Sequence, residues 1–340
     1  MRLIERVWFE KHPARFVLVP LLFPLSVLFY VITSVRKYAY KTGLVSHFRA
    51  NVPVIIVGNI GVGGNGKTPI VLWLVELLRK RGFKPGVISR GYGGKAPYYP
   101  YLLDDNSQVQ FSGDEPFLIF QRTKVPVCVG ANRQQSIEKL QASGCDIIIA
   151  DDGMQHYKLG RDIEIAVVDG KRRFGNGLLL PAGPLRELPK RLATTDFVIC
   201  NSGESHINEV PMSLAPGYFV NLMTNEKLSI KAFNEKYQTV NAIAGIGAPK
   251  RFFDTLTSIG VQINESKGFV DHHQFQAEDF SQLPEPQLPL LMTEKDAVKC
   301  KDFNLAHAWY LTVDAKLPDS FSQSLLEQIA QINTHSSDIL

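Results

Sequence analysis

The sequence predicts a doubly wound α/β fold with a mainly parallel sheet, a second, smaller α/β domain and an N-terminal hydrophobic helix. Three observations support this fold class. Apolar runs that suit buried strands alternate with helical patterns after residue 50. A second series of the same kind follows a stretch of weaker pattern. A long segment without any charge precedes both series.

The uncharged segment "FVLVPLLFPLSVLFYVITS" spans residues 16–34. A helix of this length is about 28 Å long, close to the roughly 30 Å hydrocarbon core of a bilayer, although Pro20 and Pro24 complicate such a span. Residues 1–50 carry eight Lys or Arg and two Glu, a net +6, which suits anionic headgroups on a cytoplasmic leaflet. The sequence favours a membrane anchor, spanning or interfacial, over a buried core helix or a secretion signal.

The remaining chain carries 29 basic and 31 acidic residues, a net −2, so no nucleic-acid-binding surface is expected. The four cysteines lie far apart, without a CxxC or Cys/His pairing, so neither a disulfide framework nor structural zinc is expected. With 340 residues, the chain is long enough for two domains. Its oligomeric state is not predictable from these features.

The strand-like runs of the first series are apolar throughout, as expected for parallel strands buried on both faces. They occupy residues 52–59, 84–90, 125–130, 146–152, 163–169 and 196–201, with helices expected at 69–81 and 132–143. The second series comprises strands at 239–247, 261–266, 289–296 and 309–315 and a helix at 249–259. We therefore expect an anchoring segment at 1–50, a core domain at 51–225 and a smaller C-terminal domain at 226–340.

A phosphate-binding loop lies between the first strand and its helix. The pattern G-x-x-x-x-G-K-[ST] is satisfied by Gly61, Val62, Gly63, Gly64, Asn65, Gly66, Lys67 and Thr68. Glycines let backbone N–H groups surround phosphate oxygens, Lys67 reaches the β- and γ-phosphates, and the Thr68 hydroxyl binds Mg²⁺. The strand before and the helix after this loop supply the required context, so the sequence predicts that ATP or another nucleoside triphosphate binds here.

"DIIIADDG" resembles a Walker B element, because an apolar strand ends in Asp151 and Asp152. Such carboxylates often only cap a strand, but the upstream loop favours a role at Mg²⁺. Either aspartate suits the metal, and we favour Asp151.

The loop lacks the signature lysine of partition ATPases and metallochaperones, because Val62 stands in its place. Guanine recognition would require N/T-K-x-D, and "TEKD" at 293–296 has its lysine elsewhere. It suits a helix start in which Thr293 caps toward Asp296. A kinase remains as the favoured class.

The motifs resemble one family, the tetraacyldisaccharide 4′-kinases of lipid A biosynthesis, over nearly the whole chain. The resemblance rests on "VGNIGVGGNGKTP", "SRGYGG", "GDEP", "DDGMQH", "PAGPLRE", "FVDHH" and "TEKDAVK", with Met154 where the family usually has an aromatic residue. It implies that ATP phosphorylates the 4′-hydroxyl of a tetraacyl glucosamine disaccharide 1-phosphate, which yields lipid IVA. It also implies a location at the cytoplasmic face of a Gram-negative inner membrane.

The resemblance further implies that Asp114 of "GDEP" and His272 of "DHH" form a catalytic acid–base pair. The loop and the Walker B strand add Lys67 and Asp151 as the other expected catalytic residues. His273 is adjacent and is not separable from His272 by sequence. Without the family, "GDEP" suits a turn with a helix cap, and "DHH" suits a metal ligand or a surface loop. Bringing the pair together requires the second domain to close over the nucleotide.

Several further residues are expected to contact the sugar or phosphate groups of the substrate. They are Arg90, Tyr92, Arg133, Arg186, Glu187 and His273; Arg suits phosphate because its guanidinium can bind two oxygens at once. His156 suits either support of the Walker B strand or a structural role.

Two alternatives remain open at this stage. A membrane-bound ATPase acting as a binding or regulatory module would hydrolyse ATP equally fast without the lipid. A small-molecule kinase whose apolar segment is a core helix would misfold when residues 1–35 are deleted.

Overall fold

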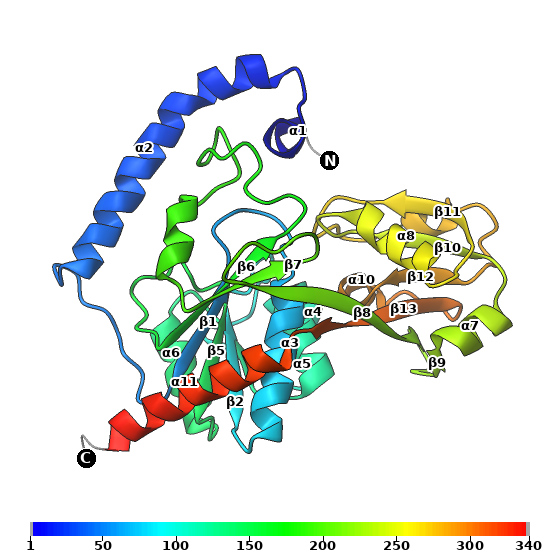
Figure 1. The fold of residues 1–340 in the computed structure, drawn as a ribbon. Helices are drawn as coiled ribbons and strands as arrows, with labels where there is room; N and C mark the ends of the chain where they lie inside the picture. Colours follow the sequence, from blue (N-terminus) through cyan, green and yellow to red (C-terminus); the bar gives the residue numbers. More distant parts are fainter. Residues whose placement is uncertain (1–2, 338–340) are drawn as a thin grey trace.

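The computed structural model describes residues 3–337 and the side chains of residues 3–332, so Arg2 of the basic N-terminal segment lies outside the described residues. A single sheet of thirteen strands runs through the molecule in the order β11-β10-β12-β13-β8-β7-β6-β1-β5-β2-β4-β3, with β9 paired to β8 (Figure 1). Among the described residues, nine strand pairings are parallel and three are antiparallel. The predicted mainly parallel α/β sheet is confirmed.

The strands of the first half are β1 (Val54–Gly58), β2 (Pro85–Ser89), β3 (Tyr101–Leu102), β4 (Val127–Val129), β5 (Ile147–Asp151), β6 (Ile163–Asp169) and β7 (Phe197–Asn201). Its helices are α3 (Lys67–Lys80), α4 (Val109–Ser112), α5 (Asp114–Thr123), α6 (Arg133–Ala142) and the 3₁₀ helix η1 (Pro189–Thr194). The second half contains β8 (Glu209–Asn221), β9 (Lys227–Ser229), α7 (Ile230–Lys236), β10 (Val240–Ala244), α8 (Pro249–Ser258), β11 (Ile263–Gly268), α9 (Ala277–Ser281), β12 (Leu290–Thr293), α10 (Glu294–Cys300), β13 (Ala308–Lys316) and α11 (Asp319–Ser337). Every strand and helix expected in the two series is present, within a few residues of its expected bounds.

The central strand β1 explains why its sequence is apolar throughout. Ile55 and Val57 face one core, which α3, α5 and α11 cover, whereas Val54 and Ile56 face a second core, which α6 covers. All four side chains are buried because β5 and β6 flank the strand and helices cover both faces. The carboxyl end of this strand is thereby fixed where the phosphate-binding loop begins.

The stretch of weak pattern contains β8, a strand that its sequence pattern does not predict. Residues 209–212 of β8 pair in parallel with β7, and residues 213–221 pair antiparallel with β13. The strand contains Pro211 and Pro216 and alternates irregularly between buried and exposed positions, because it changes partners along its length. β8 thus joins the two halves of the sheet. The domain boundary near residue 225 stays a prediction.

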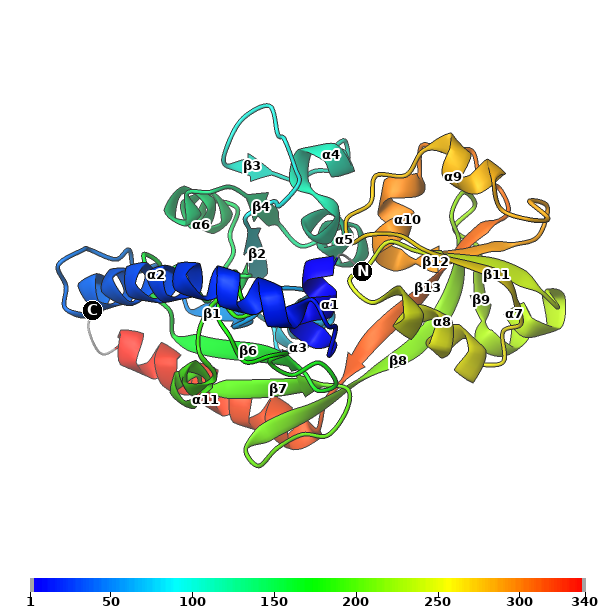
Figure 2. The same ribbon diagram turned by 90° about the horizontal axis from the view of Figure 1, so that it is seen from above.

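The N-terminal helices α1 (Leu3–Phe9) and α2 (Arg15–Lys41) lie along one side of the first half (Figures 1 and 2). α2 continues through Pro20 and Pro24, and only 6% of its most apolar window is buried. A buried core helix is therefore excluded. It is the one helix among the described residues that is long and apolar enough to cross a membrane.

Three hydrogen bonds attach α1 and α2 to the first half. The buried Ser26 hydroxyl, halfway along α2, donates a hydrogen bond to the carbonyl of Leu179 at 2.9 Å and accepts one from the Ala182 amide at 3.0 Å. The Trp8 indole donates to the carbonyl of Pro181 at 3.1 Å. The loop around residues 179–182 therefore fixes where α2 sits.

Candidate active site

The phosphate-binding loop joins β1 to α3, as its sequence predicts. Gly66 has a left-handed backbone (φ 89°), and a Cβ atom there would lie 2.3 Å from Nδ2 of Asn201, so glycine is required. The same Asn201 amide, at the end of β7, donates to the Asn65 carbonyl at 3.0 Å. On the other side, the Val62 amide donates to the carbonyl of Pro184 at 2.9 Å. The loop is held in shape from both sides, with Lys67 opening the helix.

Asp151 and Asp152 lie at the end of β5, beside this loop, and their environments differ. Asp151 is almost fully buried, and its Oδ1 has no hydrogen-bond partner. Burial, and then the charge of Glu115, raise the pKa of Asp151 to about 7. Asp152 also loses solvation by burial, but Lys67, 3.4 Å away, and Arg186, 3.0 Å away, lower its pKa to about 2.

This arrangement fits a divalent cation at Asp151. A buried carboxylate oxygen without a partner is costly unless a cation or a proton satisfies it. The residues 3–337 contain no group of three or more His, Cys, Asp or Glu side chains that could hold a metal alone. A Mg²⁺ site of the nucleotide-dependent kind needs only one carboxylate, a hydroxyl such as that of Thr68 and phosphate oxygens.

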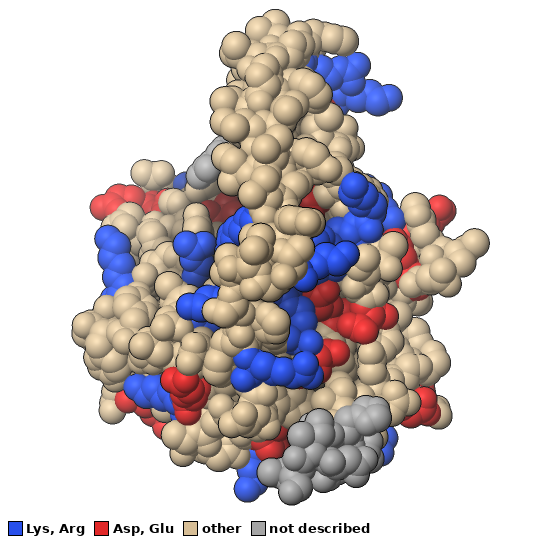
Figure 3. Space-filling view, turned by 90° about the vertical axis from the view of Figure 1, so that its left-hand side faces the viewer, with Lys and Arg blue, Asp and Glu red and all other residues tan. Residues whose placement is uncertain are grey.

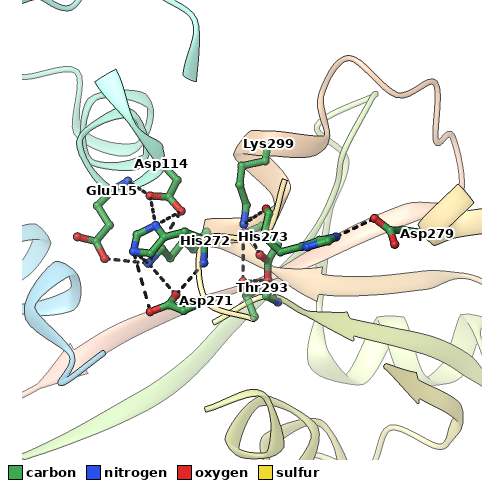
Figure 4. Close-up of polar contacts among 11 residues, drawn as sticks. Asp114, Glu115, Asp271, His272, His273, Asp279, Thr293 and Lys299 are labelled. Atoms are coloured by element: carbon green, nitrogen blue, oxygen red, sulfur yellow. Dashed lines mark hydrogen bonds and ion pairs between the residues drawn. The ribbon is translucent and has the colours of Figure 1, made fainter. Parts of the chain in front are cut away.

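Asp114 and His272, 158 residues apart, meet across the two halves (Figure 4). Nδ1 of His272 lies 3.0 Å from both carboxylate oxygens of Asp114, which opens α5 after the left-handed Gly113. The Asp114 carboxylate accepts a hydrogen bond from Nδ1 of His272 and so raises the pKa of His272, against the effects of burial and of Lys295. Burial acts to raise the pKa of Asp114, but His272 and Lys295 lower it overall. The structure therefore brings together the two residues that the resemblance pairs.

His273 points the other way (Figure 4). Its Nε2 lies 2.8 Å from Oδ2 of Asp279, and its ring stacks on Phe269 with centroids 4.4 Å apart. The left-handed backbone of His272 (φ 59°) directs these neighbouring side chains to opposite sides of the loop. The geometry favours His272 over His273 for the pair and gives His273 a place in the packing of the second half. Its expected contact with substrate has no support in this arrangement.

A cavity of 1180 Å³ joins the phosphate-binding loop, the two aspartates after it and the Asp114–His272 pair. It is lined by the phosphate-binding loop, Asp114, His272, Asp151 and Asp152, and also by α2 residues between Phe29 and Lys41. Of the residues expected to contact substrate, Arg90, Tyr92, Arg186 and Glu187 line it too. Tyr92 is 72% exposed, and its ring centroid lies 5.4 Å from that of His272. The cavity thus extends from the nucleotide loop to the apolar helix.

Arg133 does not line this cavity. It is 4% exposed and lies behind β5, where its Nη2 donates to the main-chain carbonyl of Asp151 at 3.2 Å. His156 lies near it in a separate hollow of 320 Å³, and burial together with Arg133 lowers the pKa of His156 to about 4. Arg133 thus supports the end of the Walker B strand, whereas the role of His156 stays a prediction.

No sequence motif indicated the charged residues around the pair. Lys295 of α10 lies 2.8 Å from Glu115, 3.4 Å from Asp271 and 3.9 Å from Asp114. Arg122 of α5 likewise spans the halves and bonds to Glu294 at 2.8 Å. The helix start predicted from "TEKD" is confirmed, because the Thr293 side chain accepts a hydrogen bond from the Asp296 amide at the start of α10. That correct interpretation gave no sign of what Lys295 touches.

Comparison with known proteins shows which family has a similar sequence and structure. Residues 18–330 match the family model described as tetraacyldisaccharide-1-P 4′-kinase. The chain is 55% identical to the tetraacyldisaccharide 4′-kinase of Colwellia psychrerythraea, over 96% of this chain and 97% of that protein, and 50% identical to that of Vibrio vulnificus, over 97% of each. Among solved structures, LpxK of Aquifex aeolicus, in an "apo" form in complex with ATP, superposes with a TM-score of 0.77 at 26% identity, over 92% of this chain and all of that one.

Proposed function

This chain belongs to the tetraacyldisaccharide-1-P 4′-kinase family, and we propose that Asp114 and His272 form its acid–base pair. The enzyme transfers the γ-phosphate of ATP to the 4′-hydroxyl of the tetraacyl glucosamine disaccharide 1-phosphate, which yields lipid IVA in lipid A biosynthesis. One observation carries the proposal. The pair, the phosphate-binding loop and the apolar helix α2 all line a single cavity.

In this proposal the nucleotide lies on the loop from Gly61 to Thr68. Backbone N–H groups surround the phosphates, and Lys67 is positioned at their β,γ end by Asp152, 3.4 Å away. Thr68 and Asp151 would hold Mg²⁺, with Asp152 beside them. When bound, the ion supplies positive charge that stabilises the transferring phosphoryl group.

The proton of the sugar 4′-hydroxyl goes to Nε2 of His272. The imidazole is the accessible end of the pair, since its side chain is 29% exposed and that of Asp114 only 5%. As the bond between the 4′-oxygen and the γ-phosphorus forms, the bond from that phosphorus to the β,γ-bridging oxygen breaks and ADP leaves. Asp114 holds Nδ1 throughout, which orients the ring and stabilises the imidazolium that forms.

The glycolipid headgroup is proposed to lie between the pair and α2. Arg186 stands at the cavity beside Asp152, and Glu187 lies 3.6 Å from Lys37 of α2. Arg90 and Tyr92 face the same space from the loop after β2. These side chains offer donors and acceptors to sugar hydroxyls and to a phosphate group.

We further infer that α2 brings the cavity to the cytoplasmic face of the inner membrane. Phe16, Val17 and Leu21 are 71%, 69% and 68% exposed, a patch that water does not favour. Lys and Arg side chains flank this apolar surface (Figure 3), and they suit anionic headgroups. A substrate with four acyl chains stays in the bilayer, so the enzyme must reach it there.

Incubation with labelled ATP and the tetraacyl disaccharide 1-phosphate in detergent tests the proposed function. We expect label at the 4′-oxygen of the lipid and no transfer by Asp114→Ala or His272→Ala beyond a small residual rate. ATP hydrolysis that is equally fast with and without the lipid would instead support the ATPase alternative.

Flotation with vesicles of phosphatidylethanolamine and phosphatidylglycerol tests the membrane proposal. We expect Leu21→Asp to reduce vesicle binding severalfold, whereas Ile207→Asp, at a 92% exposed position outside α2, leaves it unchanged. Equal binding by both variants would contradict a role for α2.

A further inference from the structure

Lys295 occupies a site where both halves of the molecule meet the His272 ring. It follows the first residue of α10, and its side chain is only 16% exposed. From the first half, α5 presents Glu115 at 2.8 Å and Asp114 at 3.9 Å. From the second half, the loop after β11 presents Asp271 at 3.4 Å and Nε2 of His272, also at 3.4 Å.

The contact between Lys295 and His272 specifies where the ring carries its proton. Burial acts to lower the pKa of Lys295, but Glu115, Asp114 and Asp271 raise it overall, so the side chain stays an ammonium. An ammonium has three donors and no acceptor. Nε2 of His272 must therefore present its lone pair to Lys295, which leaves the proton on Nδ1, where Asp114 accepts it at 3.0 Å.

The surrounding carboxylates act in the opposite direction. Asp114 from α5 and Asp271 from the same loop both favour an imidazolium, whereas Glu115 pairs with Lys295 and Tyr92 contributes an aromatic face. Lys295 is a cation that lies against Nε2, whereas Lys299 of the same helix pairs with Asp296 and donates to the His273 carbonyl. Without Lys295, His272 would retain its proton to higher pH, and a protonated ring cannot accept one from the sugar.

We propose that Lys295 is a positioning residue that opposes protonation of His272, with Nδ1–H toward Asp114 and the Nε2 lone pair held toward Lys295 until the sugar 4′-hydroxyl replaces it as the donor. This inference rests on the proposed role of His272 as the base. It gives the lysine of "TEKD" a function that its helix-start motif does not reveal. With this role for Lys295, the state of the proton acceptor His272 depends on the contact between α5 and α10, which belong to different halves.

The pH profile of labelled-phosphate transfer under kcat/KM conditions tests the proposal. In Lys295→Met, we expect the acidic limb to move upward by about one pH unit, so that activity well below the limb falls about tenfold relative to the plateau. Lys295→Arg keeps the charge and should keep the limb near its wild-type position. A purely structural role would lower the plateau without moving the limb.

Lys301→Met is the matched control. This exposed lysine follows α10 and also faces α5, with its Nζ 3.5 Å from Oε1 of Gln121, but it has no contact with His272. We expect its profile to equal that of the wild type. An acidic limb in Lys295→Met that coincides with the wild-type limb would overturn the inference.

His272→Gln separates failure of this inference from failure of the base assignment. If the acidic limb persists in His272→Gln, the assignment of His272 as the base is wrong. If it disappears there but does not move in Lys295→Met, only the role of Lys295 is wrong. Should Lys295→Met lose ATP binding through misfolding, ¹⁵N NMR of histidine-labelled wild-type protein decides, with His272→Gln to assign the signal. We expect the Nδ1–H tautomer, and an Nε2–H ring would contradict the proposal.

Discussion

Replacing His272 by alanine removes the proposed proton acceptor while the nucleotide site stays intact. Loss of a general base costs a factor of about 10²–10⁴ in turnover, or roughly 2.7–5.5 kcal/mol of barrier. The structure places the expected loss in the lower part of this range, at about 10²–10³. Asp114 remains 3.9 Å from Lys295, so its carboxylate keeps its charge and a nearby partner when the ring is gone. It can then serve as a weaker acceptor.

The assay is single-turnover transfer of labelled phosphate to the tetraacyl disaccharide, together with ATP binding by equilibrium titration. His273→Ala is the matched control, because this neighbouring ring bonds to Asp279 on the other side of the loop. We expect wild-type ATP affinity in both variants and near wild-type turnover in His273→Ala. Asp114→Ala should lose about 10²–10⁴-fold. Wild-type turnover in His272→Ala, or an equal loss in His273→Ala, would refute the reasoning.

Three further predictions concern the nucleotide loop and its support. Lys67→Ala should abolish transfer to the lipid, and measurable transfer at saturating ATP would contradict the role of the loop. Gly66→Ala should weaken ATP binding at least tenfold in the same titration. The backbone of residue 66 has a φ of 89°, and the added Cβ atom would lie 2.3 Å from the Asn201 amide nitrogen. Unchanged affinity would contradict this close approach. Unfolded His156 takes up a proton near pH 6.5, whereas folded His156 does so only near pH 4, so the free energy of unfolding should fall by at most about 3 kcal/mol as the pH drops from 6.5 to 4. Urea unfolding of wild type and His156→Gln, compared at pH 7 and 4.5, measures this loss, and equal losses in both would exclude His156 as its source.

The first half of the fold was predictable because its signals are local. Strands such as Ile147–Asp151 are apolar up to the final aspartate. The glycines in the loop from Gly61 to Thr68 indicate a backbone that turns around phosphate groups. β8 was not predictable in this way. It pairs with β7 over its first residues and with β13 over the rest, so no single face is buried along its length and no period appears.

The site residues likewise divide into those that local motifs place and those whose surroundings depend on tertiary contacts. Lys67, Thr68 and Asp151 could be placed from motifs, because a strand end and a helix start fix where these side chains go. The direction of Arg133 could not, since a residue that opens a helix just after a strand can face either side of the sheet, and here it lies behind β5. The environment of Lys295 depends on Glu115, 180 residues away in the sequence. Such a contact exists only after the two halves have folded together.

The attachment of α2 at Ser26 divides the helix into two parts that have different surroundings. Every α2 residue that lines the cavity lies after Ser26, whereas Phe16, Val17 and Leu21 before it face outward. In the proposed membrane-bound state, a lipid beside α2 would meet apolar side chains before Ser26 and tyrosines, lysines and Arg36 after it. Its acyl tails and its sugars would then lie at different positions along one helix. The attachment point would set how far a headgroup must leave its leaflet before phosphorylation can begin.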